Sequence, residues 1–157
     1  MKRPDRMVFY EGLSDLQQAE MGHLLALFST TLPGWVDRVT VVLWSPTPEE
    51  PKFDHNAVVT LQPEYRRLCI TIDESFFSHT YHERKYRVAH ELAHAVLAPF
   101  CVQWRTDIQM ALPDGVDDPR YKVMADNWTD RIEAATSDLT AMLLRVVDAD
   151  SSAAVRA

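Results

Sequence analysis

The residues best suited to chemistry lie in one segment, Tyr86–Val96, which contains the pattern His-Glu-x-x-His. On a helix, residues four apart differ by about 40° around the axis and by one turn along it. His90 and His94 would therefore point the same way and could hold one metal ion through their imidazole nitrogens. Glu91 stands beside the pair, where its carboxylate could accept a proton from a water that the metal activates. Zinc-assisted hydrolysis needs this arrangement.

The sequence around this motif predicts a helix from Tyr81 to Ala98. Thr80 and Glu83 have the types and spacing of a capping box at its start, and Pro99 predicts its end. Apolar residues at helical spacing predict a buried face, namely Val88, Leu92 and Val96. The two histidines lie off the centre of this face, where a cleft could form. The alternative interpretation is a pair of surface histidines on an amphipathic helix.

A zinc site usually has a third protein ligand and keeps one position for water. None of the six histidines follows His94, and Leu97 and Phe100 stand where the longer His-Glu-x-x-His-x-x-Gly-x-x-His motif has its Gly and third His. The sequence therefore argues against a metzincin-type site and favours a downstream carboxylate. Glu133 is the only glutamate after Glu91, and it lies in a segment with helical periodicity.

The sequence leaves the third ligand open between Glu133 and other residues. Asp130, three residues earlier on the same helical face, is the main substitute, and His79 or His82 is an upstream alternative. Glu133 could also be only a solvated charge on an amphipathic helix. Three carboxylates are candidates for orienting a ligating imidazole from behind, namely Asp126, Asp130 and Asp138.

The remaining sequence predicts the elements that position these residues. A first helix is expected from Leu16 to Thr31, with a capping box formed by Ser14 and Gln17 and an end at Pro33. Three strands are expected from β-branched and alternating apolar residues, at residues 39–44, 57–62 and 68–73. Their loop lengths suit an antiparallel meander or a small mixed sheet.

The other segments are expected to be less regular, apart from one long helix near the end of the chain. Residues 1–12 are predicted to be an irregular lead-in. Residues 100–119 contain turn signals and are predicted to be an irregular loop that could form a cleft wall or lid. Helical periodicity returns over residues 120–147. Residues 148–157 are predicted to be a frayed tail.

The composition indicates one globular domain, at residues 1–147, with enough length for a core. The chain has 157 residues, of which 46% are hydrophobic and 25% charged, and a net charge of −7. An acidic chain is a poor candidate for binding nucleic acid or an anionic membrane through a broad basic patch. Cys69 and Cys101 form no Cys-x-x-Cys pair, and are expected to be thiols in a reducing compartment. A disulfide between them stays open.

His90-Glu91-Leu92-Ala93-His94, followed by Glu133 before an Ala- and Leu-rich run, resembles the zincin metallopeptidases of the gluzincin type. Within that class it resembles the minimal phage and bacterial peptidases of the ImmA/IrrE type. Ser137 occupies the place of Asp in the gluzincin Glu-x-x-x-Asp pattern, and Asp138 is one residue later. The resemblance implies an α+β, zincin-like fold. In it, a small twisted sheet of about three strands packs on an N-terminal helix, the His-Glu-x-x-His helix and a C-terminal glutamate helix.

These observations together predict a zinc-dependent metallopeptidase in which His90, His94 and Glu133 bind Zn²⁺ and Glu91 is the general base. Three residues are candidate donors to the oxyanion of the reaction intermediate, namely Tyr81, His82 and Tyr121. The expected partner is a protein or peptide substrate along a sheet edge, with no nucleic acid and no membrane. The expected compartment is a bacterial cytoplasm, the host's if the protein is phage-encoded.

Two other functions remain compatible with the sequence. One is a zinc-stabilised, non-catalytic binding or regulatory protein, for example from a phage, whose cleft a partner would occupy. The other is a zinc hydrolase that acts on a non-peptide bond.

Overall fold

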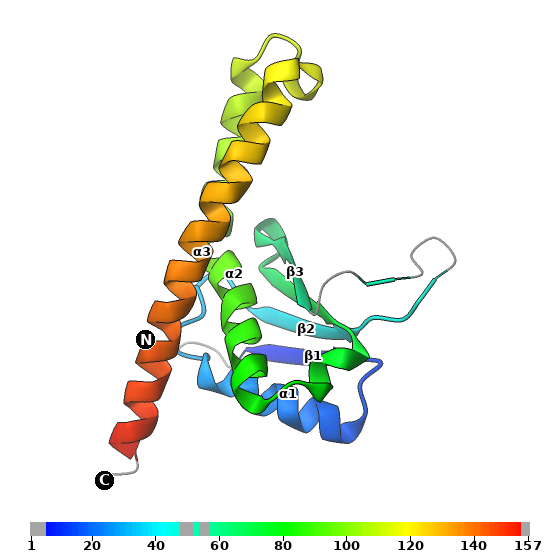
Figure 1. Cartoon of the computed structure of the whole chain (residues 1–157), viewed down its shortest axis with the longest axis vertical. Helices are drawn as coiled ribbons and strands as arrows, with labels where there is room; N and C mark the ends of the chain where they lie inside the picture. Colours follow the sequence, from blue (N-terminus) through cyan, green and yellow to red (C-terminus); the bar gives the residue numbers. More distant parts are fainter. Residues whose placement is uncertain (1–5, 48–51, 54–56, 155–157) are drawn as a thin grey trace.

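The computed structural model describes residues 6–47, 52–53 and 57–154 of the chain. Within these residues, three α-helices and a four-stranded mixed sheet form an α+β architecture (Figure 1). The elements along the chain are β1 (Met7–Glu11), α1 (Asp15–Leu27), β2 (Arg38–Leu43), β3 (Ala57–Gln62), the 3₁₀ turn η1 (Pro63–Tyr65), β4 (Arg67–Ile72), η2 (Glu74–Ser78), α2 (Tyr81–Ala111), η3 (Gly115–Asp117) and α3 (Pro119–Ala154).

The sheet has the strand order β1-β2-β4-β3, with one antiparallel pair. β1 and β4 each run parallel to β2, whereas β3 runs antiparallel to β4. The chain reaches β2 from β1 through α1, as a parallel connection requires, while the short turn η1 joins the antiparallel β3 and β4. Arg66 closes that turn in the left-handed region, with φ of 55°. Because β3 stands last in the strand order, it is an edge strand.

The prediction of about three strands was one strand short, because β1 is a fourth strand inside the predicted irregular lead-in at residues 1–12. Residues 1–5 of that lead-in lie outside the described residues. Its partner is β2, and Val8 pairs with Val39 about thirty residues later. Val8, Phe9 and Tyr10 are residue types that favour a strand, and the prediction missed this signal, whereas the identity of the pairing partner cannot be seen in these five residues. The predicted strand at 57–62 is confirmed, and the other two begin and end one residue earlier than expected.

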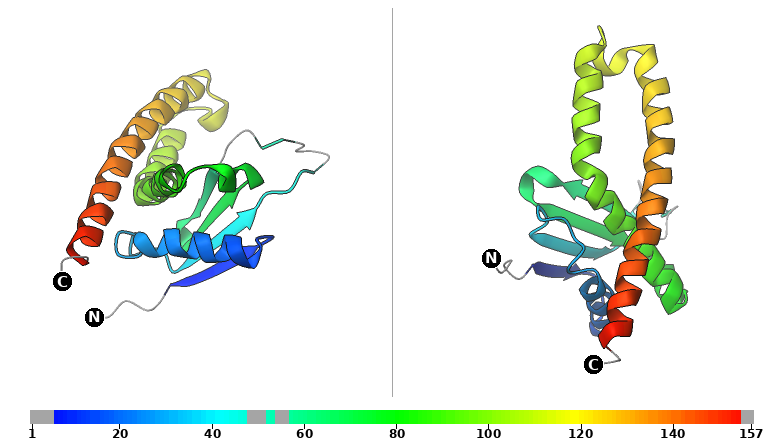
Figure 2. Two further views of the ribbon diagram at one scale, coloured as in Figure 1. Left: turned by 60° about the horizontal axis from the view of Figure 1, so that its bottom comes forward. Right: turned by 90° about the vertical axis from the view of Figure 1, so that its left-hand side faces the viewer.

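One face of the sheet carries the hydrophobic core. Alternate residues of β2 and β4, such as Val41 and Ile70, are fully buried, while their neighbours in sequence are partly exposed. They form a single cluster with Leu24 of α1, Leu92 of α2 and Leu143 of α3. α1 and α2 therefore lie on the same side of the sheet, and α3 packs mainly on α2 (Figure 2).

α2 does not end at Pro99 as predicted, but continues to Ala111. Proline removes one backbone hydrogen bond and costs about 3 kcal/mol inside a helix. Pro99 is exposed, and the helix continues through it. Beyond it, Trp104 stacks on Trp128 of α3, with ring centroids 4.7 Å apart and planes 2° apart. Packing against α3 thus stabilises the helix past the proline.

The predicted loop at residues 100–119 is therefore mostly helix, and α2 and α3 form a long antiparallel hairpin. Its outer part projects beyond the sheet (Figure 2), and we call residues 99–131 the arm. α3 begins at Pro119 because Asp118 accepts a hydrogen bond from the Arg120 backbone N–H at 2.9 Å, an N-cap followed by proline. α3 also continues through most of the predicted frayed tail, to Ala154, and residues 155–157 lie outside the described residues.

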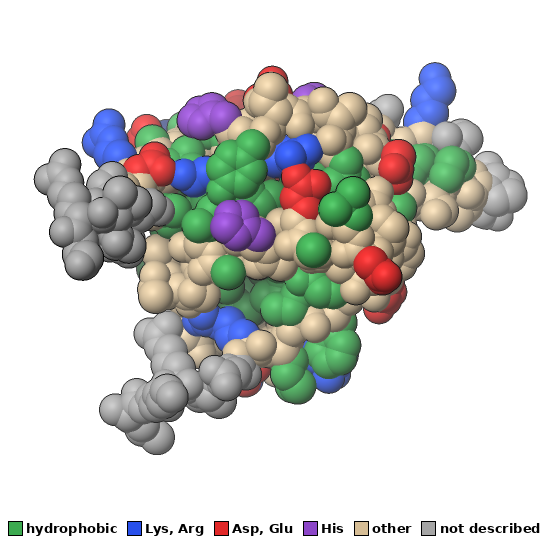
Figure 3. Space-filling model, turned by 90° about the horizontal axis from the view of Figure 1, so that it is seen from below, with side chains coloured by type: hydrophobic (Ala, Val, Ile, Leu, Met, Phe, Trp, Pro, Cys, Tyr) green, Lys and Arg blue, Asp and Glu red, His purple; other side chains and the backbone are tan. Residues whose placement is uncertain are grey.

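No helix in the described part of the chain is long and apolar enough to cross a membrane. The face opposite the arm mixes hydrophobic, acidic and basic side chains, without a broad patch of one charge sign among the residues drawn (Figure 3).

Candidate metal centre

α2 places His90 and His94 on the edge of the core. Its start is fixed by the predicted capping box: the Thr80 N–H donates to Glu83 Oε2 at 2.8 Å, and the Glu83 N–H donates to Thr80 Oγ1 at 3.3 Å. Val88 and Leu92 are buried on the face towards the sheet. The two histidines are half-buried, with ring centroids 4.9 Å apart. Packing on either side of the motif therefore holds both imidazoles at the helix edge.

α3 brings Glu133 opposite these imidazoles. Glu133 Oε2 lies 3.5 Å from His90 Nε2, and Glu133 Oε1 lies 3.5 Å from His94 Nε2. The antiparallel pairing of the helices sets this position, since Lys85 near the start of α2 pairs with Asp148 near the end of α3. Residues some forty positions apart in the sequence thus share one site.

The three side chains can hold a metal ion. Their ligand atoms all lie within 4.8 Å of one another. A tetrahedral ion with bonds of about 2.1 Å separates its ligands by about 3.4 Å, close to the two spacings of 3.5 Å between imidazole and carboxylate. Among the described residues, Asp130, His79 and His82 do not belong to this group. The structure therefore joins Glu133, and not its substitutes, to the histidines.

Thr136 lies behind His94. Its Oγ1 is 3.3 Å from His94 Nδ1, and the threonine is fully buried. A hydrogen bond at Nδ1 orients the ring so that Nε2 faces Glu133. Burial lowers the pKa of His94, an effect that Glu133 opposes and His90 adds to. A lowered pKa keeps the imidazole neutral, as a metal ligand must be.

His90 is placed differently from His94. Its Nδ1 is buried and has no hydrogen-bond partner among the described residues. Its ring instead stacks on Tyr86, one turn earlier, with centroids 6.4 Å apart. Packing rather than a hydrogen bond therefore orients this imidazole.

The Glu91 side chain extends from α2 towards β3 of the sheet. It is 8% exposed, and the backbone N–H of Val59 in β3 donates a hydrogen bond to its carboxylate. The pKa of Glu91 is raised to about 7, chiefly by burial and in smaller part by the charge of Glu133, against the lowering effect of the Val59 hydrogen bond. A carboxyl group with this pKa can both accept and release a proton near neutral pH.

A cleft of about 710 Å³ opens over these residues. One wall is β3, from Ala57 to Leu61, and the other is formed by α2 and α3. His90, His94, Glu91 and Glu133 all line it. The candidate metal centre is thus open to a ligand lying between the edge strand and the helices.

The predicted oxyanion donors do not reach this cleft. Tyr81, His82 and Tyr121 are not among the residues that line it. The Tyr81 ring lies near His23 instead, with centroids 6.2 Å apart. Tyr121 stands twelve residues before Glu133 on α3, about 18 Å along the helix. The structure therefore does not bring these three residues to the metal ligands.

The two cysteines are not joined by a disulfide. Cys69 lies in β4, whereas Cys101 lines the cleft. Burial raises the pKa of both thiols. Neither therefore has the ready thiolate of a catalytic cysteine.

The sequence prediction missed Thr136 and Val59. A signal for Thr136 exists, because it stands between Ile132 and Leu139 on the apolar stripe of α3, where a hydroxyl needs a partner. Val59 acts through its backbone N–H, so no residue type could have indicated it.

No protein-family model matches the chain, and comparisons with curated proteins and with solved structures found no match.

Proposed function

We propose that this protein is a zinc-dependent metallopeptidase with a zincin-like arrangement. The observation that supports the proposal best is the position of Glu91. It is buried beside a three-ligand group but is not part of it, and it faces a cleft bounded by an edge strand. A metal centre that only stabilised the fold would have no need of a fourth, proton-accepting carboxyl at this place.

The roles of the residues follow from this geometry. His90, His94 and Glu133 would hold zinc, which when bound supplies a Lewis acid and lowers the pKa of a water towards about 7. Glu91 takes a proton from the attacking water and later gives it to the leaving amine. Thr136 fixes the orientation of the His94 imidazole through its contact with Nδ1. The outward backbone groups of β3, apart from the Val59 N–H that bonds Glu91, can pair with an extended peptide.

Hydrolysis of a quenched-fluorescent peptide library tests the proposal. The protein stripped with a chelator should be inactive, and addition of zinc should restore cleavage. Glu91→Gln should retain zinc and lose at least 100-fold in kcat/KM. Cleavage by Glu91→Gln at the parent rate would refute the assignment of the base.

The alternative is a zinc-stabilised protein that binds a partner without catalysis. It predicts zinc-dependent stability and peptide binding but no cleavage by the parent protein under any metal condition. Zinc content and hydrolysis measured on one sample therefore separate the two functions.

A further inference from the structure

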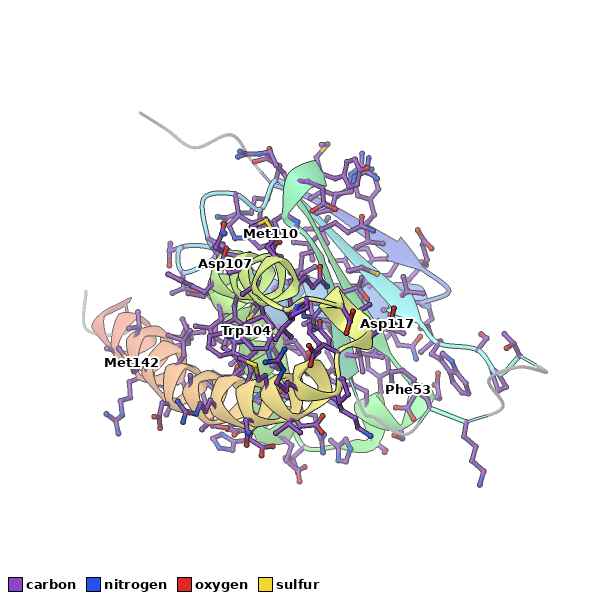
Figure 4. All side chains as sticks on the ribbon, turned by 90° about the horizontal axis from the view of Figure 1, so that it is seen from above. Phe53, Trp104, Asp107, Met110, Asp117 and Met142 are labelled. Atoms are coloured by element: carbon purple, nitrogen blue, oxygen red, sulfur yellow. The ribbon has the colours of Figure 1, made fainter. Side chains whose placement is uncertain are left out.

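The cleft extends along the hairpin beyond the metal ligands. After His94, α2 contributes Ala98, Cys101 and Val102 to its lining, and α3 contributes Trp128 and Ile132. These side chains make an apolar trough on the arm side of the candidate centre. Figure 4, which looks down the arm, shows Trp104 pointing from α2 towards α3. Its stack on Trp128, which lines the cleft, holds that indole ring in place.

Arg105 stands at the outer end of this trough. It lines the cleft and is exposed. Some cations of the structure are paired, for example Arg84 with Glu20 and Arg120 with Asp118. Arg105 forms no ion pair with any carboxylate of the described residues, and it is the arginine that lines the cleft. Its charge acts inside the trough, since it lowers the pKa of the Cys101 thiol against the larger effect of burial.

We infer that Arg105 selects substrates that carry a carboxylate beyond an apolar side chain. The inference rests on the proposed function. A peptide that continues from the centre along the trough would place an apolar side chain in the trough and a carboxylate at the guanidinium, which binds carboxylates through two parallel hydrogen bonds. The carboxylate is either an acidic side chain or the C-terminus of the peptide.

The spacing limits where this carboxylate lies. Arg105 follows His94 by eleven residues, about 16 Å along the helix. An extended chain covers about 3.3 Å per residue, so this distance corresponds to about five residues. The Arg105 side chain can extend back along α2 towards the centre, so fewer than five peptide residues can cover the distance. The carboxylate is therefore about two to five residues from the bond above the metal centre.

Peptide binding to zinc-loaded, full-length Glu91→Gln tests the inference without hydrolysis. The probes are fluorescein-labelled peptides with a central Phe and one Glu scanned over the two to five residues on either side. Matched probes carry Gln at the scanned position. A second set has no Glu and either a free or an amidated C-terminus, which separates the two sources of the carboxylate. Fluorescence anisotropy gives each Kd.

We expect the best carboxylate probe to bind about three- to tenfold more tightly than its neutral counterpart, and less so at high salt. Arg105→Gln in the Glu91→Gln background should abolish this preference. Arg145→Gln makes the same charge change at an exposed position of α3 outside the cleft, and should retain it. Arg105→Glu should reverse the preference towards probes with Lys.

Equal preferences in Arg105→Gln and Arg145→Gln would overturn the inference, as would the absence of any carboxylate preference or of any binding. Cleavage of the same probes by the protein with Glu91 intact is scored separately. Carboxylate-selective binding without cleavage would refute the peptidase proposal but support the role of Arg105 in binding. Cleavage without carboxylate selectivity would support the peptidase proposal but refute the role of Arg105.

Discussion

The hydroxyl oxygen of Thr136 lies 3.3 Å from Nδ1 of His94, on the side of the ring opposite Glu133. It orients a candidate metal ligand from a buried position. Thr136→Val keeps the shape and removes this contact, so we expect metal affinity to fall about tenfold. Competition with a chromophoric chelator measures the change. Thr140→Val removes a buried hydroxyl one turn later, which donates only to the Thr136 carbonyl. An equal loss in this control would contradict the orienting role.

Glu133 and Asp130 can be separated by isosteric substitution. Of these two carboxylates, Glu133 is the one grouped with both histidines, so Glu133→Gln should weaken zinc binding at least 100-fold. Asp130→Asn should leave it within about twofold, because its carboxylate is not part of the group. Calorimetric titration of the stripped proteins measures both affinities. Strong loss in Asp130→Asn would show that the loaded site uses a different carboxylate.

Metal removal should lower thermal stability. A ligand that binds only the folded state at one hundred times its Kd stabilises that state by about 2.7 kcal/mol. For a chain of this size the corresponding rise in Tm is roughly 5 to 10 °C. Scanning calorimetry with zinc and with chelator should show this difference in the parent protein. In Glu133→Gln, zinc should raise Tm by less than half as much. An undiminished rise in Tm in this variant would mean that zinc binds elsewhere.

The buried Glu91 should make the stripped protein sensitive to pH. Its pKa is raised from 4.5 to about 7, so the fold favours the protonated carboxyl, and its contribution to stability is lost as pH rises from 4.5 through 7. In chelator, Glu91→Gln should therefore be more stable than the parent by about 3 kcal/mol at pH 8 and about 1 kcal/mol at pH 5. Urea unfolding measures both differences. Glu64→Gln, at an exposed position, is the control, and a pH-independent gain in Glu91→Gln would contradict the burial argument.

The stack of Trp104 on Trp128 should hold the arm together. Trp104→Ala removes the stack and should lower the free energy of local opening by about 2 kcal/mol. Hydrogen exchange should then become faster over residues 99–131, while the sheet keeps its protection. Met110→Ala, at a side chain that is 74% exposed on the arm, should change nothing. Faster exchange across the whole chain would show that the arm does not open independently.

Local sequence patterns predicted the parts of the site that lie within one element. The capping box of Thr80 and Glu83 and the spacing of His90 and His94 depend only on helix geometry. The extension of α2 past Pro99 depends instead on Trp128, which lies far along the chain and forms a partner surface for Trp104. Similarly, nothing near Met7–Glu11 reveals that β2 will pair with it. Predictions based on local signals failed where contacts with a distant part of the chain determined the secondary structure.

The antiparallel pairing of α2 and α3 places Glu133 and His94, 39 residues apart, at one point. A metal held there would join two distant parts of the chain, as a disulfide does. In the unfolded chain the same bond would close a long loop, whose lost conformational entropy grows with the logarithm of its length. The arm and the end of α3 would then be held in register by coordination as well as by packing. Zinc binding should accordingly strengthen the pairing of the two helices.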